Sequence, residues 1–162
     1  MKTLLILRHA KSSRDDVSLP DHDRPLSKRG LRDAPRIGHL LCEERLVPDL
    51  ILASTAVRAL QTATFVAQAS RYDRELRTLP ELYLAEAAVY LSIVRRLDET
   101  HGRVMVVGHN PGIEELVLAL TGRAESMPTA ALAHIRFPAD RWADVALAGP
   151  GELVNLWRPK QL

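Results

Sequence analysis

The stretch LLILRHAKSS, residues 4–13, begins as a run of apolar residues and ends abruptly in two polar side chains, Arg8 and His9. Successive apolar residues without polar alternation are typical of a strand that is buried on both faces, as in parallel sheets covered by helices. A second stretch, VMVVGHNPGIEEL at residues 104–116, repeats this pattern and places His109 after another apolar run. The two stretches predict two buried strands, each carrying an imidazole at its carboxyl end.

Strands and helices are expected to alternate over most of the chain. The expected strands cover residues 3–7, 48–54, 77–82 and 103–107, and the expected helices cover residues 27–45, 56–69, 86–99 and 111–120. Ser27 is in position to cap the first helix, and Ser54 or Thr55 the second. Residues 11–26 are rich in turn formers and predict a loop, while ALAHIRF and GELVNLWRP near the end are strand-like. The alternation predicts an α/β three-layer sandwich in which a mostly parallel central sheet is flanked by helices.

The composition is that of an ordinary globular chain. With 162 residues, of which 46% are hydrophobic, the sequence predicts one domain over residues 1–162. The net charge is only +2 and the arginines are scattered along the sequence, so no nucleic-acid partner is expected. No apolar run approaches the roughly 18 residues that span a bilayer, and the apolar start is too short for a signal peptide. We therefore expect no membrane association and a cytoplasmic location. The single cysteine, Cys42, cannot form an intrachain disulfide and is expected to be a small core residue.

Four candidate functional residues fall at one edge of the expected sheet. In sheets of this kind the ligand crevice lies outside the carboxyl ends of the strands. Arg8 and His9 follow the first strand, His109 follows the fourth, and Arg58 lies in the first helical turn after the second strand. The two histidines share one crevice if the first and fourth strands are neighbours, which sequence spacing alone does not show.

Two guanidinium groups and two imidazoles at one edge are suited to phosphate chemistry. Arginine presents a permanently charged planar fork that matches phosphate oxygens, and helix starts nearby would add backbone N–H donors. Neutral imidazole is a nucleophile that titrates near neutral pH, with an unperturbed pKa of about 6.5. The histidines lack the HxxxH or HxH spacing of common metal sites, so neither a metal nor another cofactor is expected. The pattern indicates a site for a phosphate dianion in which one histidine attacks phosphorus.

Four motifs, in order, resemble those of the histidine phosphatase superfamily, the phosphoglycerate-mutase-like phosphatases. LLILRHAKSS is similar to the N-terminal Arg-His motif, with Ala10 where many members carry glycine. LSKRG, at residues 26–30, resembles the motif at the start of the first helix. ILASTAVRALQTA, at residues 51–63, resembles the segment that supplies the second arginine, and VMVVGHNPGI, at residues 104–113, resembles the second-histidine motif. The Gly-His-Asn-Pro form of the last motif is similar to the short SixA-type phosphohistidine phosphatases.

This resemblance implies a phosphoglycerate-mutase-like fold in which the first and fourth strands are neighbours. It implies that His9 is the nucleophile that becomes phosphohistidine. It also implies that Arg8, Arg58 and His109 form the pocket that holds the phosphoryl group.

The resemblance also implies candidates at the margin of the site. Many members of the family use an acidic residue after the third strand to protonate the leaving oxygen. Glu81 lies in the comparable region, with Glu86 as a less favoured candidate. The short branch need not depend on such an acid, because a phosphoramidate leaves as imidazole once its nitrogen is protonated. Lys11 and Ser12 directly follow the nucleophile and are expected to line the phosphate rim.

The sequence thus favours a metal-independent phosphatase with a phospho-His9 intermediate that acts on phosphohistidine in a partner protein. Residues 71–90 leave little material for a lid, and an open site suits a phosphorylated side chain on another protein. Three alternatives stay open at this point. They are a phosphatase for small phosphomonoesters such as sugar phosphates or nucleotides, a non-catalytic phosphate-binding module on the same fold, and a metallohydrolase that EDTA would inactivate.

Overall fold

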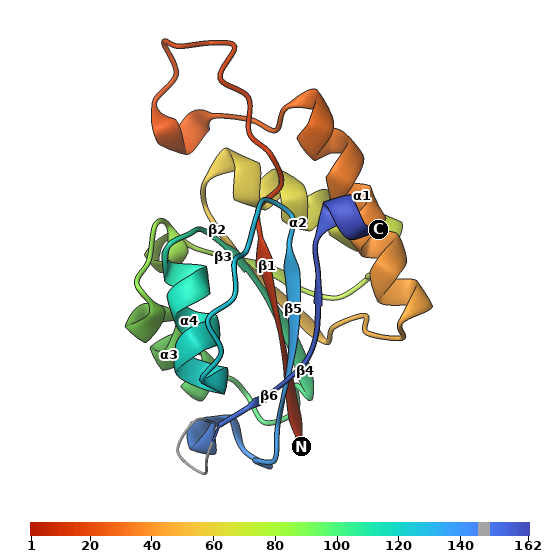
Figure 1. Cartoon of the computed structure of the whole chain (residues 1–162), viewed down its shortest axis with the longest axis vertical. Helices are drawn as coiled ribbons and strands as arrows, with labels where there is room; N and C mark the ends of the chain where they lie inside the picture. The colour runs from red at the N-terminus through yellow and green to blue at the C-terminus, as the bar shows by residue number, and fades with distance from the viewer. Residues whose placement is uncertain (146–149) are drawn as a thin grey trace.

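The centre of the molecule is a six-stranded sheet (Figure 1). The computed structural model describes residues 1–145 and 150–162. Across the sheet the order is β3 (Leu76–Leu79), β2 (Leu50–Ser54), β4 (Arg103–Gly108), β1 (Lys2–Arg8), β5 (Leu132–Phe137) and β6 (Glu152–Trp157). The first four of these strands are parallel, whereas β5 runs antiparallel to β1 and β6 antiparallel to β5. The mostly parallel sheet expected from the sequence is therefore confirmed.

Strand β1 lies in the middle of the sheet because its apolar residues can be covered on both faces. Residues 4–7 have no exposed surface. Leu4 and Ile6 point into one core and Leu5 and Leu7 into the other, as the period of two in a strand requires. β1 pairs with β4 from Thr3 opposite Arg103 to Arg8 opposite Gly108. This register brings the carboxyl ends of the two strands side by side.

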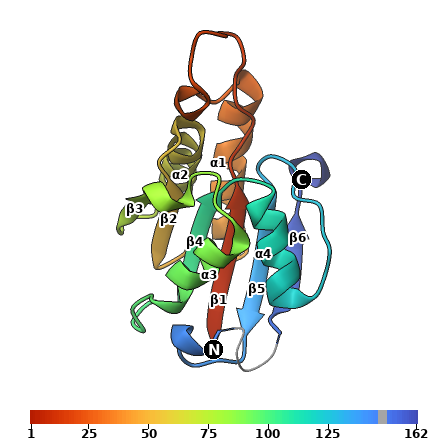
Figure 2. The same ribbon diagram turned by 90° about the vertical axis from the view of Figure 1, so that its left-hand side faces the viewer.

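Two layers of helices cover the sheet, which Figure 1 shows edge-on and Figure 2 face-on. α1 (Lys28–Glu43) and α2 (Val57–Ala69) pack on the face that carries Leu5 and Leu7. α3 (Ala87–Arg95) and α4 (Gly112–Thr121) pack on the opposite face. The three-layer sandwich follows from these two cores. Among the described residues, no helix combines the length and the apolar character that a bilayer crossing requires.

At the ends of the elements, one expectation from the sequence is confirmed and others are wrong. Ser27 caps α1 as predicted, because its Oγ accepts a hydrogen bond from the Gly30 N–H at 3.2 Å. The expected cap of α2 is wrong, since Ala56 holds that position without a side-chain bond. The third strand ends at Leu79, because a 3-10 helix at Pro80–Leu82 follows it and proline has no N–H to donate to a sheet.

Cys42 is also not a core residue. Its side chain is exposed at the end of α1, and its Sγ donates to the carbonyl oxygen of Ser70 at 3.3 Å. The loop at residues 11–26 extends beyond the carboxyl ends of the parallel strands (Figures 1 and 2). It contains a short 3-10 helix, Asp21–Asp23, and an isolated bridge from Ser12 to Leu26. This loop therefore borders the sheet edge at which the candidate residues lie.

Candidate active site

The two predicted histidines meet at the carboxyl ends of β1 and β4. Their ring centroids are 5.2 Å apart, and the His9 N–H donates to the Gly108 carbonyl oxygen at 3.1 Å. His9 is 7% exposed and His109 is 1% exposed. The parallel pairing of their strands, which spacing could not show, places both imidazoles in one cleft.

A backbone contact fixes which nitrogen of His9 is free. The His9 Nδ1 lies 2.7 Å from the carbonyl oxygen of Ala10. A carbonyl only accepts, so Nδ1 carries the ring proton and the lone pair is on Nε2. Among the described residues, Nε2 forms no hydrogen bond. Burial is the main cause that lowers the pKa of His9 from 6.5 to about 4. The hydrogen bond to Ala10 acts in the opposite direction and raises the pKa, whereas the Arg58 and Arg8 guanidiniums lower it further. His9 is therefore neutral at pH 7, with its nucleophilic nitrogen unoccupied.

His109 is held by hydrogen bonds to two other elements. Its Nε2 lies 2.8 Å from the Ser54 Oγ at the end of β2. Its backbone N–H donates at 3.2 Å to the Tyr90 hydroxyl of α3. Gly108 permits this approach, because a Cβ there would lie 2.1 Å from the Tyr90 hydroxyl oxygen. Burial lowers the pKa of His109 to about 3, and the nearby His9 and Arg58 also lower it. The second imidazole is thus fixed in place and neutral.

Ser54 also determines the donor that His109 can offer. The Ser54 Oγ already accepts from the Ala56 N–H at 3.2 Å, which leaves its own proton available for the His109 Nε2. In that arrangement the ring proton of His109 is on Nδ1. Nδ1 is buried and has no hydrogen-bond partner in the described part of the chain. A buried donor without a partner is costly, and a phosphoryl oxygen would satisfy it.

Arg58, in the first turn of α2, is almost fully buried at 4% exposure. Its guanidinium donates to the Asp21 carbonyl oxygen at 2.7 Å and to the Asp21 carboxylate at 2.9 Å. The same carboxylate accepts from the Tyr83 hydroxyl at 2.5 Å and from Arg24 at 2.9 Å. The Tyr83 hydrogen bond, followed by those to Arg58 and Arg24, holds the pKa of Asp21 well below its usual range. Asp21 is therefore an ionised partner that positions Arg58.

The predicted residues other than the two glutamates share one cleft of about 200 Å³. It is lined by Arg8, His9, Lys11, Ser12, Arg14, Arg24, Arg58, Leu84, His109, Asn110 and Thr129. No carboxylate side chain is among these lining residues, and five of them are cationic. The charge of the cleft is therefore suited to an anion. Within the described residues, no cluster of three histidine, cysteine or acidic side chains could hold a metal ion.

Glu81 and Glu86 are not brought to this cleft. Glu81 is exposed in the 3-10 helix after β3, and Glu86 is exposed at the start of α3. Neither is among the residues that line the cleft.

The sequence analysis missed the loop residues of the site. Arg24 donates to the Ser12 hydroxyl and to the Ser13 carbonyl oxygen, and Asp21 holds Arg58. The segment DHDRPLS contains both residues just before a helix cap. Its charges were the only available signal, because a loop has no periodicity that would place side chains.

The lowered histidine pKa values predict how the free protein responds to pH. Because both pKa values lie below 6.5, the folded protein binds fewer protons than the unfolded chain between about pH 4 and 6.5. In an NMR titration of the imidazole nitrogens, we expect His9 to keep its Nδ1–H tautomer at pH 5.5 and to titrate near pH 4. His109 is expected to titrate near pH 3 or with unfolding. Midpoints near 6.5 for both rings would contradict this description of the site.

The lowered pKa values of His9 and His109 also make the free energy of unfolding depend on pH. The free energy of unfolding is not reduced by the two rings above pH 6.5, where they are neutral in both states. As the pH falls from 6.5 toward 4, the unfolded chain takes up protons that the folded protein does not, so the free energy of unfolding decreases. Urea unfolding at a series of pH values should show this decrease, and it should be smaller in the variant His9→Ala.

Comparisons with known proteins point to one family. The family model described as histidine phosphatase superfamily (branch 1) matches residues 4–86. An uncharacterized chloroplastic protein of Arabidopsis thaliana is 35% identical over 160 residues, which cover 93% of this chain and 73% of that protein. An uncharacterized protein of Mycobacterium tuberculosis is 33% identical over 165 residues, covering 95% of this chain and 100% of that protein.

Solved structures with the same architecture include two SixA proteins. A provisionally assigned phosphohistidine phosphatase SixA from Agrobacterium tumefaciens is similar at a TM-score of 0.84 and 30% identity, with 98% of each chain covered. The protein histidine phosphatase SixA complexed with tungstate is similar at a TM-score of 0.85 and 23% identity, again over 98% of each chain. The latter likeness concerns the fold alone.

Proposed function

This chain belongs to the histidine phosphatase superfamily, and on that basis we propose that it is a metal-independent phosphatase that removes phosphate from phosphohistidine in a partner protein. One observation carries the proposal. The neutral His9 leaves its Nε2 lone pair free in a cleft that is lined by four arginines and one lysine and by no carboxylate. One of these arginines, Arg58, is held in place by Asp21. A nucleophile of this kind, surrounded by cations, is suited to attack phosphorus in a bound dianion.

In the first step, the Nε2 lone pair of His9 forms a bond to phosphorus. The bond from phosphorus to the departing imidazole nitrogen breaks, and that nitrogen keeps the electron pair and receives a proton from solvent. Arg8, Arg58 and the Nδ1–H of His109 bind the non-bridging oxygens as their charge redistributes in the transition state. The phosphoryl group is then on His9.

In the second step, water attacks the phosphoryl group of His9. The water oxygen bonds to phosphorus, the Nε2–phosphorus bond breaks, and the electron pair returns to Nε2. Both protons of the water leave with the inorganic phosphate, which can release one of them to solvent. Because Nδ1 keeps its proton, the phosphorylated ring is a cation, and the Ala10 carbonyl oxygen at 2.7 Å stabilises it. A ring that keeps its Nδ1 proton leaves as neutral imidazole, which is a better leaving group than an imidazolate anion, so this contact favours rapid release of phosphate.

The surroundings of the cleft support a protein substrate. Leu84, on the rim of the cleft, is 55% exposed and can contact the protein that carries the phosphohistidine. The cleft itself is small, and its contacts are suited to the phosphoryl group rather than to the remainder of a metabolite.

The experiment that tests this function compares substrates under matched conditions. We expect the protein to hydrolyse a phosphohistidine-bearing protein with a kcat/KM at least tenfold above that for sugar phosphates, nucleotides or a chromogenic ester, with and without EDTA. A preference for a small ester would favour the phosphomonoesterase alternative. Absence of turnover on every substrate would favour a non-catalytic module, and loss of activity with EDTA would favour a metallohydrolase.

The variant Glu81→Gln tests whether an acid assists the leaving group. Because Glu81 is exposed and outside the cleft lining, we expect less than a twofold change in kcat/KM on a phosphoramidate. An imidazole leaving group also needs a protein acid less than an alkoxide does. Kinetics on a phosphoramidate and on an oxygen ester are measured side by side. A loss of tenfold or more on the ester alone would assign the acid role to Glu81.

A further inference from the structure

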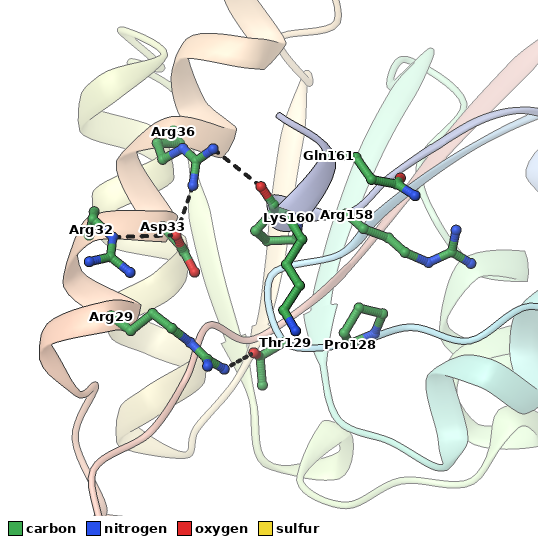
Figure 3. A pocket seen from close by; sticks show the side chains of 10 residues that line it. Arg29, Arg32, Asp33, Arg36, Pro128, Thr129, Arg158, Lys160 and Gln161 are labelled. Atoms are coloured by element: carbon green, nitrogen blue, oxygen red, sulfur yellow. Dashed lines mark hydrogen bonds and ion pairs between the residues drawn. The ribbon is translucent and has the colours of Figure 1, made fainter.

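A second cavity, of about 490 Å³, lies between α1 and the 3-10 helix η4 (Pro159–Gln161) (Figure 3). Five of its lining residues are cationic and one is acidic: Arg29, Arg32, Arg36, Arg158, Lys160 and Asp33. The arginines of α1 recur at intervals of three and four residues and therefore lie on one face of the helix. Arg158 and Lys160 come from more than 120 positions further along the chain. The fold therefore brings together charges that are far apart in the sequence.

Two of these cations are already engaged by the protein. Arg36 donates to Asp33 at 3.1 Å and to the Pro159 carbonyl oxygen at 3.2 Å, and so ties α1 to η4. Arg158 donates to Glu125 at 3.3 Å and to the Ser126 carbonyl oxygen at 3.0 Å. These contacts give the cavity fixed walls.

The other three cations keep spare donors. Within residues 1–145 and 150–162, Arg29 donates only to the uncharged Thr129 hydroxyl, at 3.3 Å. Arg32 is 67% exposed and lies 4.0 Å from Asp33, which Arg36 already binds more closely. Lys160 makes no hydrogen bond or ion pair within the described residues, and Figure 3 shows its side chain extending toward Thr129. Three like charges that converge on one hollow raise the local concentration of anions.

The cavity and the catalytic cleft share one lining residue. Thr129 lines both hollows. The next residue, Ala130, donates its N–H to the carbonyl oxygens of Arg8 and His9, both at 3.1 Å. The segment between the two hollows is therefore bonded directly to the end of the catalytic strand. A ligand chain with its phosphoryl group on His9 could continue over Thr129 into the basic cavity.

We propose that the Arg29–Arg32–Lys160 cluster binds an acidic segment of the same protein that presents the phosphohistidine. This inference rests on the proposed function and names a property of its partner. The donors are on long side chains spread over two elements, and the cavity is larger than one phosphate needs, so several carboxylates fit it better than a single inorganic anion. The confined extent of the cluster favours a short acidic peptide over a nucleic-acid backbone, which would need a longer basic stripe.

The test uses two synthetic phosphohistidine peptides, one with four glutamates on each side of the phosphohistidine and one with glutamines in their place. For the wild type at low salt, we expect kcat/KM to be at least tenfold higher for the glutamate peptide, mainly through KM. In the triple variant Arg29→Glu, Arg32→Glu, Lys160→Glu, this ratio should fall to about one or below. The variant Arg74→Glu, Arg96→Glu, Arg141→Glu carries the same charge change on residues that line neither hollow and should keep the preference.

Two further measurements separate the failure of this inference from that of the proposed function. Turnover of a small phosphoramidate should be the same in the wild type and both triple variants, which also shows that they fold. Binding of the glutamate peptide without phosphate, measured by fluorescence anisotropy, tests the cluster even if no phosphohistidine substrate is hydrolysed. Equal binding of the glutamate and glutamine peptides, a preference that persists in the Arg29/Arg32/Lys160 variant, or tighter binding of a single-stranded oligonucleotide would overturn the inference.

Discussion

Replacing His9 with alanine is expected to lower kcat/KM on a phosphohistidine substrate by about four orders of magnitude or more. The loss is this large because the variant has no atom that can bond to phosphorus in the first step. The other histidine of the cleft cannot take over the role. His109 Nε2 is engaged by Ser54, and its ring is only 1% exposed. Steady-state kinetics with a phosphohistidine protein measure the effect.

Two controls make the His9→Ala result specific. His39→Ala removes an exposed histidine on α1 that does not line the cleft, and it should leave kcat/KM within about twofold. His9→Gln retains much of the side-chain volume, so that a shared loss of activity in both His9 variants is not a packing effect. A His9→Ala protein that keeps its thermal stability and turns over at the wild-type rate would end the proposed mechanism.

The second large effect is expected for Arg58→Ala, which should lower kcat/KM by about 100- to 1000-fold. Removal of a preorganised charged donor from a transition state typically has this magnitude. Arg58 is buried and is oriented by two hydrogen bonds to Asp21, so little reorganisation precedes its contact with phosphate. Arg58→Lys should recover only part of the loss, because an ammonium cannot form the bidentate fork. The measurement is kcat and KM for both variants on one phosphoramidate.

A matched arginine gives the control for this prediction. Arg96 is exposed after α3, and its guanidinium donates to the Ser92 carbonyl oxygen at 3.2 Å and to no other group in the described part of the chain. Arg96→Ala should therefore leave the kinetics unchanged within about twofold. If Arg58→Ala also kept more than half of the wild-type kcat/KM, Arg58 would have no part in binding the phosphoryl group.

The sheet could be predicted because its central strands are continuous apolar runs. Burial on both faces requires helices on both sides, and residues 4–7 indeed have no exposed surface. The neighbour of β1 could not be derived from periodicity, since any buried strand fits beside another. The family resemblance supplied that pairing, and the register of β1 with β4 confirms it. The antiparallel direction of β5 also gave no signal, because an apolar strand reads alike in either direction.

The residues of the candidate site could also be predicted only in part. His9, His109 and Arg58 could be placed because each follows a predicted strand at the sheet edge where ligands bind. Asp21 could not, because it comes from the loop and reaches Arg58 only through tertiary packing. Ser54 shows a different failure. A serine before a helix usually caps it, but here its Oγ lies 2.8 Å from the His109 Nε2 and Ala56 takes the cap position.

The basic cavity could not be predicted from the sequence, because the residues that line it are far apart along the chain. Arg29 and Lys160 looked like isolated surface charges, and the net charge of +2 gave no sign of a cationic surface. They line one hollow because Arg36 binds the Pro159 carbonyl oxygen and so holds η4 against α1. Charge patterning therefore has to be judged on the folded surface.

The central claim is that phosphate passes through His9, and covalent trapping tests it most directly. The protein is mixed for milliseconds with a radiolabelled phosphohistidine protein, quenched in alkali, where phosphohistidine is stable, and digested for peptide mapping. The account predicts a burst of acid-labile, base-stable label on the peptide that contains His9, and none in the His9→Ala variant. Full turnover with no label on the protein, or with label on another residue, would contradict it.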